Sequence, residues 1–286
     1  MTLSTLTDHV FTSDGLRLHY IETGLSTGPV IVLLHGLRGN ARNWLPVAEP
    51  LASRYRIIAL DERGRGDSDW DPDDNYSRAA AVLDVERLVA ELGLTRFILG
   101  GHSMGGSHAV AYAATHPDQV RALILEDPAI FAPAASGLPG PSNRVGRELG
   151  DAPDGFDSWD AAKAYMRALR PGGTDEEMET RTANFLNRQP DGSVTWRFDL
   201  QGLRRYRQRS DRDQPEAAWR DALALRCPTL ILRGQLSDIV PAAVAQALVW
   251  DNPEARCVEI AGASHSVHAD NLPDFMTAVE AFLATL

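Results

Sequence analysis

Ser103 lies between glycines in the stretch GGHSMGG (residues 100–106), directly after the apolar run RFIL (96–99). Gly101, Ser103 and Gly105 form the pattern G-x-S-x-G between a predicted strand and a predicted helix. A serine hydroxyl on such a bend can attack a carbonyl carbon when a neighbouring base removes its proton. The glycines permit a tight turn and leave room for close neighbours. A plain turn is the alternative interpretation of the same residues.

Two histidines, His265 and His268, are the candidates for the base. His102 lies inside the predicted bend, and His116 precedes Pro117 at the end of a predicted helix. A zinc pair at His265 and His268 has little support, since no third ligand stands at a suitable spacing. We therefore expect no metal.

Three carboxylates follow predicted strands and can orient such a base by accepting its Nδ1 proton. Glu126 and Asp127 end the run ALILED, and Asp238 lies in GQLSDIVP (234–241). The residues alone leave all three open.

The elements that must position these groups alternate between strands and helices. Short apolar runs, too apolar to alternate, are typical of parallel strands buried on both faces. The predicted strands are 16–22, 30–35, 55–60, 96–100, 121–126, 229–234 and 256–260, and the main predicted helices are 78–92, 104–115 and 273–286. This order predicts an α/β protein with a doubly wound, mostly parallel sheet.

The alternation stops after Asp127 and resumes near Cys227. We therefore predict a core of residues 1–127 and 223–286, and an inserted, mainly helical cap of residues 128–222, called the inserted segment below. Within it, residues 192–199 are expected to form a strand pair or an extended return to the core. An insertion at the carboxyl edge of the sheet can roof a cavity.

The composition excludes several classes of partner. The chain has 286 residues and a formal net charge of -11, which argues against nucleic acid and anionic membranes. The N-terminal residues show no signal-peptide pattern and no apolar run reaches the length of a membrane span, so we expect a cytoplasmic protein. Cys227 and Cys257 are expected to be free thiols. A small-molecule substrate is the expected partner, and a homo-oligomer is left open.

Four stretches, in this order and context, resemble the α/β-hydrolase family over most of the chain outside the inserted segment. They are HGLRGN (35–40), DERGRGDSD (61–69), GHSMGG (101–106) and GASHSVHADNLP (262–273). The resemblance implies the α/β-hydrolase fold and an oxyanion hole made by the backbone amides of Leu37 and Met104. It also implies His265 as the base, a supporting role for His35, and a structural role for residues 61–69.

The family resemblance also separates the acid candidates. Most members carry the acid after the seventh strand, where this chain has Ser237, with Asp238 one place late. Some members, such as zearalenone lactonase and acetamidomethylene-succinate amidohydrolase, keep it after the sixth strand, which corresponds to Asp127. Asp127 is therefore preferred, with Asp238 and then Glu126 as alternatives.

A serine nucleophile indicates acyl transfer, in contrast to the aspartate of related epoxide hydrolases and haloalkane dehalogenases. We expect hydrolysis of a small carboxylic ester or lactone through an acyl-enzyme, with no cofactor. Cleavage of an amide or carbon–carbon bond in a carboxylate-bearing metabolite is an alternative, as is a non-catalytic ligand-binding homologue.

Substrate contacts are expected from Arg38, Phe131 and Trp159. The inserted segment is rich in arginine, which suits either a solvated face paired with acids or a cation above the site; the first interpretation is favoured. These arginines include Arg144, Arg147, Arg167, Arg170, Arg181, Arg188 and those of RRYRQR (204–209).

Overall fold

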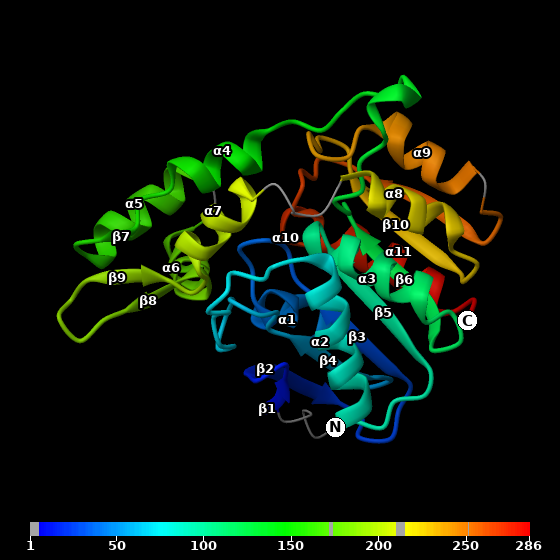
Figure 1. The fold of residues 1–286 in the computed structure, drawn as a ribbon, viewed down its shortest axis with the longest axis horizontal. Helices are drawn as coiled ribbons and strands as arrows, with labels where there is room; N and C mark the ends of the chain where they lie inside the picture. Colours follow the sequence, from blue (N-terminus) through cyan, green and yellow to red (C-terminus); the bar gives the residue numbers. More distant parts are fainter. Residues whose placement is uncertain (1–5, 172–173, 210–214, 251) are drawn as a thin grey trace.

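The computed structural model describes residues 6–171, 174–209, 215–250 and 252–286. An eight-stranded sheet forms its centre, in the order β1-β2-β4-β3-β5-β6-β10-β11 (Figure 1). Strands β1 and β2 are antiparallel to their neighbours, and the pairs from β4 to β11 are parallel. The predicted doubly wound, mostly parallel sheet is confirmed.

The strands of this sheet are β1 (Thr7–Ser13), β2 (Leu16–Gly24), β3 (Val30–Leu34), β4 (Arg56–Leu60), β5 (Phe97–His102), β6 (Val120–Glu126), β10 (Thr229–Gly234) and β11 (Ala255–Ile260). The helices around it are η1 (Ala41–Trp44), α1 (Leu45–Leu51), α2 (Arg78–Glu91), α3 (Met104–Thr115), η2 (Ala134–Ser136), α8 (Pro215–Ala224), α9 (Ala242–Trp250), α10 (Val267–Asp270) and α11 (Leu272–Leu283).

Helices cover both faces of the sheet and bury two separate apolar cores. Alternate residues of β3 show the division, since Val32 and Leu34 join the core under α2, α3, α8 and α9, while Ile31 and Leu33 join the core under α1 and α11. Successive side chains of a strand point to opposite faces, so a strand between two helical layers must be apolar throughout. This explains why the central runs do not alternate in the sequence.

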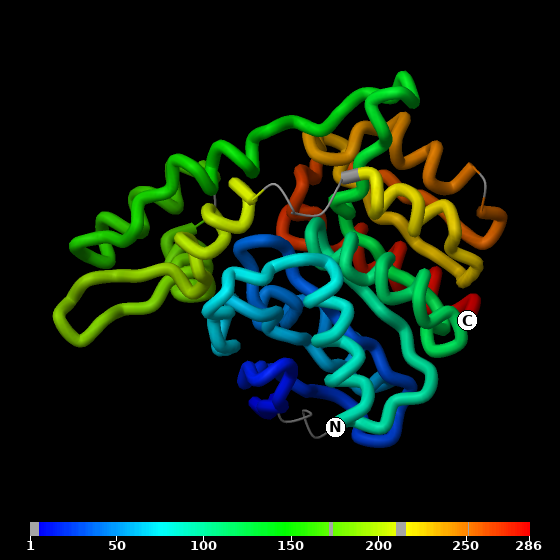
Figure 2. Tube along the Cα trace, in the orientation of Figure 1, coloured from blue at the N-terminus to red at the C-terminus, as the bar shows by residue number. Residues whose placement is uncertain are grey.

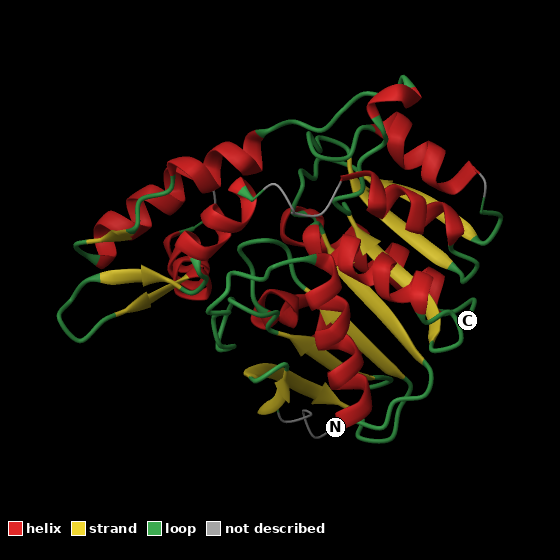
Figure 3. Cartoon of the chain, in the orientation of Figure 1, coloured by secondary structure: helices red, strands yellow, loops and turns green. Residues whose placement is uncertain are grey.

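The part of the inserted segment from α4 to α7 forms a layer of its own beside the carboxyl edge of the sheet (Figure 3). It contains α4 (Arg144–Asp151), β7 (Gly155–Phe156), α5 (Trp159–Leu169), α6 (Asp175–Phe185), β8 (Leu186–Arg188), β9 (Val194–Trp196) and α7 (Leu200–Gln208). The three short strands form an antiparallel sheet in the order β7-β9-β8. Residues 192–199 therefore contribute one strand, β9, which pairs with β7 and β8, and not the strand pair that was one of the two predicted alternatives.

Figure 2 follows the chain as it leaves the large sheet after β6 and comes back to it at α8. Helix α8 begins before the predicted boundary at residue 223, and its Ala218, Trp219 and Ala222 pack in the core with α3. The inserted segment has a separate apolar cluster, which includes Trp196 and Phe198. In the described residues, no helix has the length and apolar character needed to cross a membrane.

Candidate active site

Ser103 occupies a strained bend between β5 and α3. Its φ of 52° and ψ of -114° lie outside the regions that L-residues favour, a conformation that costs about 1–3 kcal/mol and needs support from its surroundings. Two backbone hydrogen bonds supply that support. The Ser103 N–H donates to the Glu126 carbonyl at 2.9 Å, and the Ser103 carbonyl accepts from the Ala129 N–H at 2.8 Å.

The flanking glycines are required because other backbone atoms approach them closely. A Cβ on Gly101 would lie 2.3 Å from the Gly105 carbonyl oxygen. A Cβ on Gly105 would lie 2.5 Å from the Leu34 carbonyl oxygen, at the end of β3. Both distances are shorter than a non-bonded contact allows, so the G-x-S-x-G pattern reflects how tightly α3 packs against the ends of β3 and β5.

Three of the predicted residues form one hydrogen-bonded chain. His265 Nε2 lies 2.9 Å from Ser103 Oγ, and His265 Nδ1 lies 2.6 Å from Asp127 Oδ2. Asp127 is fully buried, while 8% of Ser103 and 9% of His265 remain accessible. A carboxylate can only accept, so Nδ1 carries the proton and Nε2 faces the serine hydroxyl as an acceptor. This is the arrangement in which a histidine can take a proton from serine.

The Asp127 carboxylate is fixed by more than the histidine. The Ser237 hydroxyl donates to Asp127 Oδ2 at 2.5 Å, and the Gly234 N–H approaches Oδ1 at 3.4 Å. Burial raises the pKa of Asp127 above its ordinary value, and the hydrogen bonds from His265 and Ser237 oppose that rise. Ser237 stands at the place where most family members carry an acid, but the sequence did not indicate that it would bind Asp127.

The structure does not bring the other two carboxylates to His265. Asp238 forms a two-pronged ion pair with Arg144 of α4, with both N–O distances 2.9 Å. Glu126 binds His268, with its Oε2 2.7 Å from His268 Nδ1. Each alternative carboxylate thus has its own partner.

His268 and Glu126 form a buried ion pair, in addition to the contact between His265 and Asp127. His268 Nδ1 faces Glu126, and its Nε2 faces the Asn43 carbonyl at 3.1 Å. Both partners only accept, so both ring nitrogens carry protons and the ring is an imidazolium. Burial alone would lower the pKa of His268, but the Glu126 charge raises it. Burial alone would raise the pKa of Glu126, but His268 and then His102 bring it down to about 2.

His102 supports the backbone of the base. Its Nε2 lies 2.9 Å from the His265 carbonyl oxygen, so this nitrogen donates. Burial lowers the pKa of His102 to about 4, and the ring is therefore neutral near pH 7. The contact ties the bend at residue 103 to the loop that carries His265.

The loop after β3 lies against the bend. A Cβ on Gly36 would lie 3.5 Å from Ser103 Cβ, so this loop and the nucleophile candidate are neighbours. Within the described residues, no acceptor is hydrogen-bonded to the backbone amides of Leu37 or Met104. The predicted support from His35 has a visible counterpart, since its Nε2 accepts from the Glu62 N–H at 3.1 Å.

A buried arginine, Arg65, contacts both Leu37 and Met104. The sequence pattern assigned this residue no role of its own. Arg65 Nε donates to the Leu37 carbonyl at 3.2 Å, and its Nη2 lies 3.4 Å from Met104 Sδ. Arg65 belongs to the stretch DERGRGDSD (61–69), so this stretch holds the loop after β3 in place beside Ser103. Such a contact is the kind of structural role that the family resemblance implies for residues 61–69. Only the folded contacts identify Arg65.

The three predicted substrate contacts lie in different surroundings. Arg38 follows Leu37 and pairs with Glu148 of α4 at 2.5 Å. Phe131 packs beside Ile239 and Val240, in a small cluster next to the loop after β10. Trp159 lies in the core of the inserted segment, where its indole N–H donates to Glu179 at 2.6 Å. Contact of these side chains with a substrate stays a prediction.

A polar cluster between β2 and the loop after β4 also contains potential metal ligands. His19, Asp61 and Asp67 have ligand atoms within 4.8 Å of one another. The Asp61 carboxylate already accepts from His19 Nδ1 at 2.7 Å and from the Ala41 and Asp67 amides. Because the carboxylate already accepts these protons, the cluster acts as a structural link between β2 and the loop after β4.

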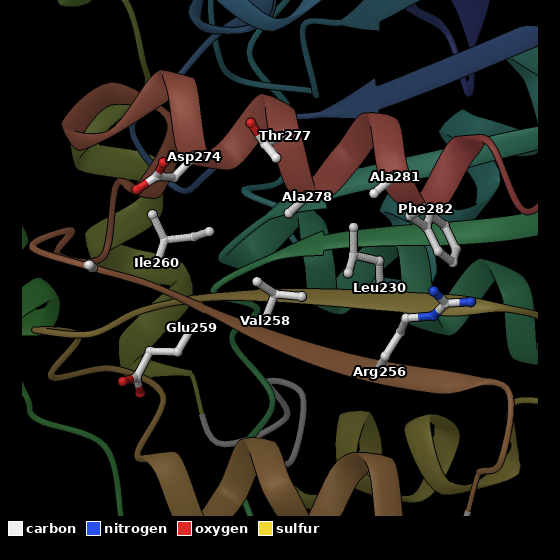
Figure 4. A pocket seen from close by; sticks show the side chains of 11 residues that line it. Leu230, Arg256, Val258, Glu259, Ile260, Asp274, Thr277, Ala278, Ala281 and Phe282 are labelled. Carbon is white, nitrogen blue, oxygen red and sulfur yellow. The ribbon is translucent and has the colours of Figure 1, made fainter.

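The hollow shown in Figure 4 lies between β11 and α11, away from these groups. It has a volume of about 400 Å³ and is lined mainly by apolar side chains such as Leu230, Val258 and Phe282. No residue of the Ser103–His265–Asp127 chain lines it. A molecule bound in this hollow would therefore not touch Ser103, His265 or Asp127.

The comparisons identify the class of protein. The model of the alpha/beta hydrolase fold family matches residues 29–272, which include Ser103, Asp127 and His265. This chain belongs to the α/β-hydrolase fold family, as its four sequence stretches predicted.

Relatives with curated names cover nearly the whole chain. The sn-1-specific diacylglycerol lipase ABHD11 of Mus musculus is 30% identical over 91% of this chain and 83% of the relative. The N-formylmaleamate deformylase of Pseudomonas putida is 29% identical over 95% of this chain and 94% of the relative. A crystal structure of an alpha/beta hydrolase from Novosphingobium aromaticivorans has a TM-score of 0.84 at 26% identity, covering 98% and 99% of the two chains. The comparisons thus support hydrolysis, on different bonds in different relatives.

The buried pair predicts a pH-dependent contribution to stability. The pKa of His268 is raised in the folded state from 6.5, so its contribution is complete below about pH 6.5 and is lost as pH rises through the folded value. We expect His268→Gln to lower the free energy of unfolding by about 3 kcal/mol at pH 6, the scale of breaking a buried ion pair. The loss should be smaller at pH 9. Urea unfolding at both pH values measures it, and an equal loss at both would contradict the assignment.

Proposed function

We propose that this protein is a serine hydrolase that cleaves a small carboxylic ester or lactone through an acyl-enzyme intermediate. The observation that carries the proposal is the hydrogen-bonded chain from Ser103 through His265 to the buried Asp127. Its order of hydroxyl, imidazole and carboxylate is the one that activates serine as a nucleophile.

In the proposed reaction, Ser103 Oγ attacks the carbonyl carbon while His265 Nε2 takes the hydroxyl proton. The imidazolium then returns that proton to the leaving alcohol as the tetrahedral intermediate collapses. In the second half, His265 Nε2 removes a proton from water as the water attacks the acyl carbon. The imidazolium then returns this proton to Ser103 Oγ as the bond to the acyl group breaks and the acid leaves. The 2.9 Å between Nε2 and Oγ suits a direct proton transfer in both halves.

Leu37 and Met104 are proposed to stabilise the negative oxygen of the tetrahedral intermediate. Their amides have no acceptor in the described structure and flank the bend from β3 and α3. Two fixed N–H donors favour charge that develops only in the transition state, and loss of one such donor costs about 100- to 1,000-fold in kcat. Arg65, which contacts both residues, is proposed to fix their spacing.

Asp127 is proposed as the acid that orients His265. The 2.6 Å contact to Nδ1 fixes the tautomer, and Ser237 holds the carboxylate in place. The ion pair of Asp238 with Arg144 supports the choice of Asp127 over Asp238.

Cleavage of an amide is the second candidate, and a specific relative favours it. One named relative is a lipase, which fits an ester, and another is a deformylase of N-formylmaleamate, which fits an amide. The same three side chains serve both reactions, since only the leaving group that His265 protonates differs. Within this proposal, the shape and polarity of the substrate pocket decide whether an ester or an amide is cleaved.

The proposal predicts that Ser103→Ala abolishes hydrolysis of 4-nitrophenyl acetate. Without Oγ no acyl-enzyme forms, so kcat should fall by at least about 1,000-fold. Release of 4-nitrophenol measures it, and 4-nitroacetanilide in parallel tests the amide alternative.

Ser107→Ala is the matched control, because Ser107 is a buried serine one turn further along α3. It should keep the wild-type rate within a few-fold. Equal release by the wild type and Ser103→Ala would contradict the proposal.

The choice of acid predicts opposite results for two aspartates. Asp127→Asn leaves the shape of the site but reverses the donor and acceptor that face Nδ1, a change that costs about 10,000-fold in kcat in a triad of this kind. Asp238→Asn weakens only the link to Arg144 and should keep kcat within a few-fold. Steady-state kinetics of both variants decide the matter, and the reverse ranking would show that Asp238 is the acid.

A further inference from the structure

The arginines of the inserted segment are mostly paired with neighbouring carboxylates. The pairs are Arg144 with Asp238 and Glu148, Arg167 with Asp175, Arg170 with Asp270, Arg188 with Glu179, Arg197 with Asp67, Arg204 with Asp154 and Arg205 with Asp74. This fits the interpretation of a surface paired with acids. Glu148 stands apart, because it binds two arginines and one of them, Arg38, lies outside the segment.

Glu148 joins α4 to the loop after β3. Its Oε2 accepts a hydrogen bond from Arg38 Nη2 at 2.5 Å, and its Oε1 accepts one from Arg144 Nη1 at 2.8 Å. Only 16% of the Glu148 side chain and 20% of the Arg38 side chain remain accessible. Salt and water therefore screen this pair less than an exposed one, and the two arginines hold the carboxylate from both of its oxygens.

Helix α4 gives Glu148 a fixed support. Leu149, the next residue, is buried in the apolar cluster of the inserted segment. One turn before Glu148, Arg144 binds Asp238 of the loop after β10 through two hydrogen bonds of 2.9 Å. The Asp238 carbonyl also accepts from the Ser142 N–H at 2.8 Å. The helix is thus attached both to the inserted segment and to the core, so the carboxylate that reaches Arg38 is held in place.

The inserted segment holds the loop after β3 at three residues. The Leu37 side chain packs against the apolar cluster of the segment. Arg38 pairs with Glu148, and the Asn40 side chain donates to the Asn184 carbonyl near the end of α6. Consecutive Cα atoms are only about 3.8 Å apart, so a shift of Arg38 moves the adjacent peptide units with it. The position of the Leu37 amide therefore depends on contacts with the inserted segment.

We propose that Glu148 is a positioning residue for the oxyanion hole, because it fixes the Leu37 amide through Arg38. The inserted segment then completes the site beside Ser103 as well as covering it. Arg65 holds the Leu37 carbonyl from the core, so core and inserted segment share the task of fixing this residue. The inference rests on the proposed function, in which the Leu37 amide donates to the negative oxygen.

The proposal predicts an effect on kcat and little effect on KM. A displaced donor stabilises the negative oxygen of the transition state less, while the neutral ground-state carbonyl loses little. Since a misplacement of about 1 Å can cost about 100-fold in rate, we expect Glu148→Gln to lower kcat for 4-nitrophenyl acetate by about 10- to 100-fold and to change KM by less than about two-fold. Glu148→Asp, which keeps the charge, should recover part of the loss.

Arg38→Gln removes the other half of the same contact. It should lower kcat by a similar factor, and the double variant should lose no more than the larger of the two single losses, because both changes break one interaction. Losses that multiply in the double variant would overturn the inference. A raised KM with an unchanged kcat would overturn it as well, since the two residues would then serve only to bind the substrate.

Asp175→Asn is the matched control. Asp175 forms an exposed ion pair with Arg167 inside the inserted segment, and neither residue contacts the loop after β3 through that pair. The control should keep both kcat and KM within about two-fold of the wild type, as expected for an exposed pair. An equal loss of kcat in Asp175→Asn and Glu148→Gln would overturn the specific role of Glu148.

Inhibition by 1,1,1-trifluoro-2-butanone examines the oxyanion hole itself. Ser103 Oγ adds to the ketone carbon, His265 takes the hydroxyl proton, and the ketone oxygen becomes the negative oxygen of a tetrahedral adduct. We expect Glu148→Gln to raise the inhibition constant by about the factor by which kcat falls, and Asp175→Asn to leave it unchanged. An unchanged constant in Glu148→Gln would overturn the inference, whereas failure of the proposed function appears separately as ester hydrolysis that survives Ser103→Ala.

Discussion

The unfavourable backbone conformation at Ser103 is the constraint on which the rest of the site depends. It persists because the Glu126 carbonyl and the Ala129 N–H hold residue 103 from both sides. Asp127 lies between these two anchors, and its own φ of 39° is also in the left-handed region. The hydroxyl and the carboxylate are thus set by one short length of chain after β6, and His265 is left to bridge them from the other end of the sequence.

The adjacent acids Glu126 and Asp127 show how one strand end serves two purposes. Each side chain binds a different histidine of the same loop: Glu126 binds His268, and Asp127 binds His265. The Glu126 pair stays charged and buried, which fixes α10, while the Asp127 pair opens onto the hydroxyl of Ser103. Stability and proposed chemistry are therefore divided between neighbouring residues.

Much of this arrangement was predictable because it is local in the sequence. The apolar runs predicted the sheet, and the glycine spacing predicted the bend. The preference for Asp127 came from the resemblance to the α/β-hydrolase family, because the residues alone left three carboxylates open. The contacts of Ser237 and Arg65 were not predictable, because each depends on which loops the fold brings together. The sequence also could not show which aromatic residues line a substrate pocket, because an aromatic side chain suits a pocket wall and a packed core alike.

Covalent labelling tests the central claim most directly. A fluorophosphonate reacts with a serine hydroxyl only when the hydroxyl is activated, so it reports on Ser103 without knowledge of the substrate. Peptide mapping by mass spectrometry should find a single adduct, on the peptide that contains Ser103, and His265→Gln should slow its formation by at least about 100-fold. Labelling at another residue, or an unchanged rate in His265→Gln, would contradict the account.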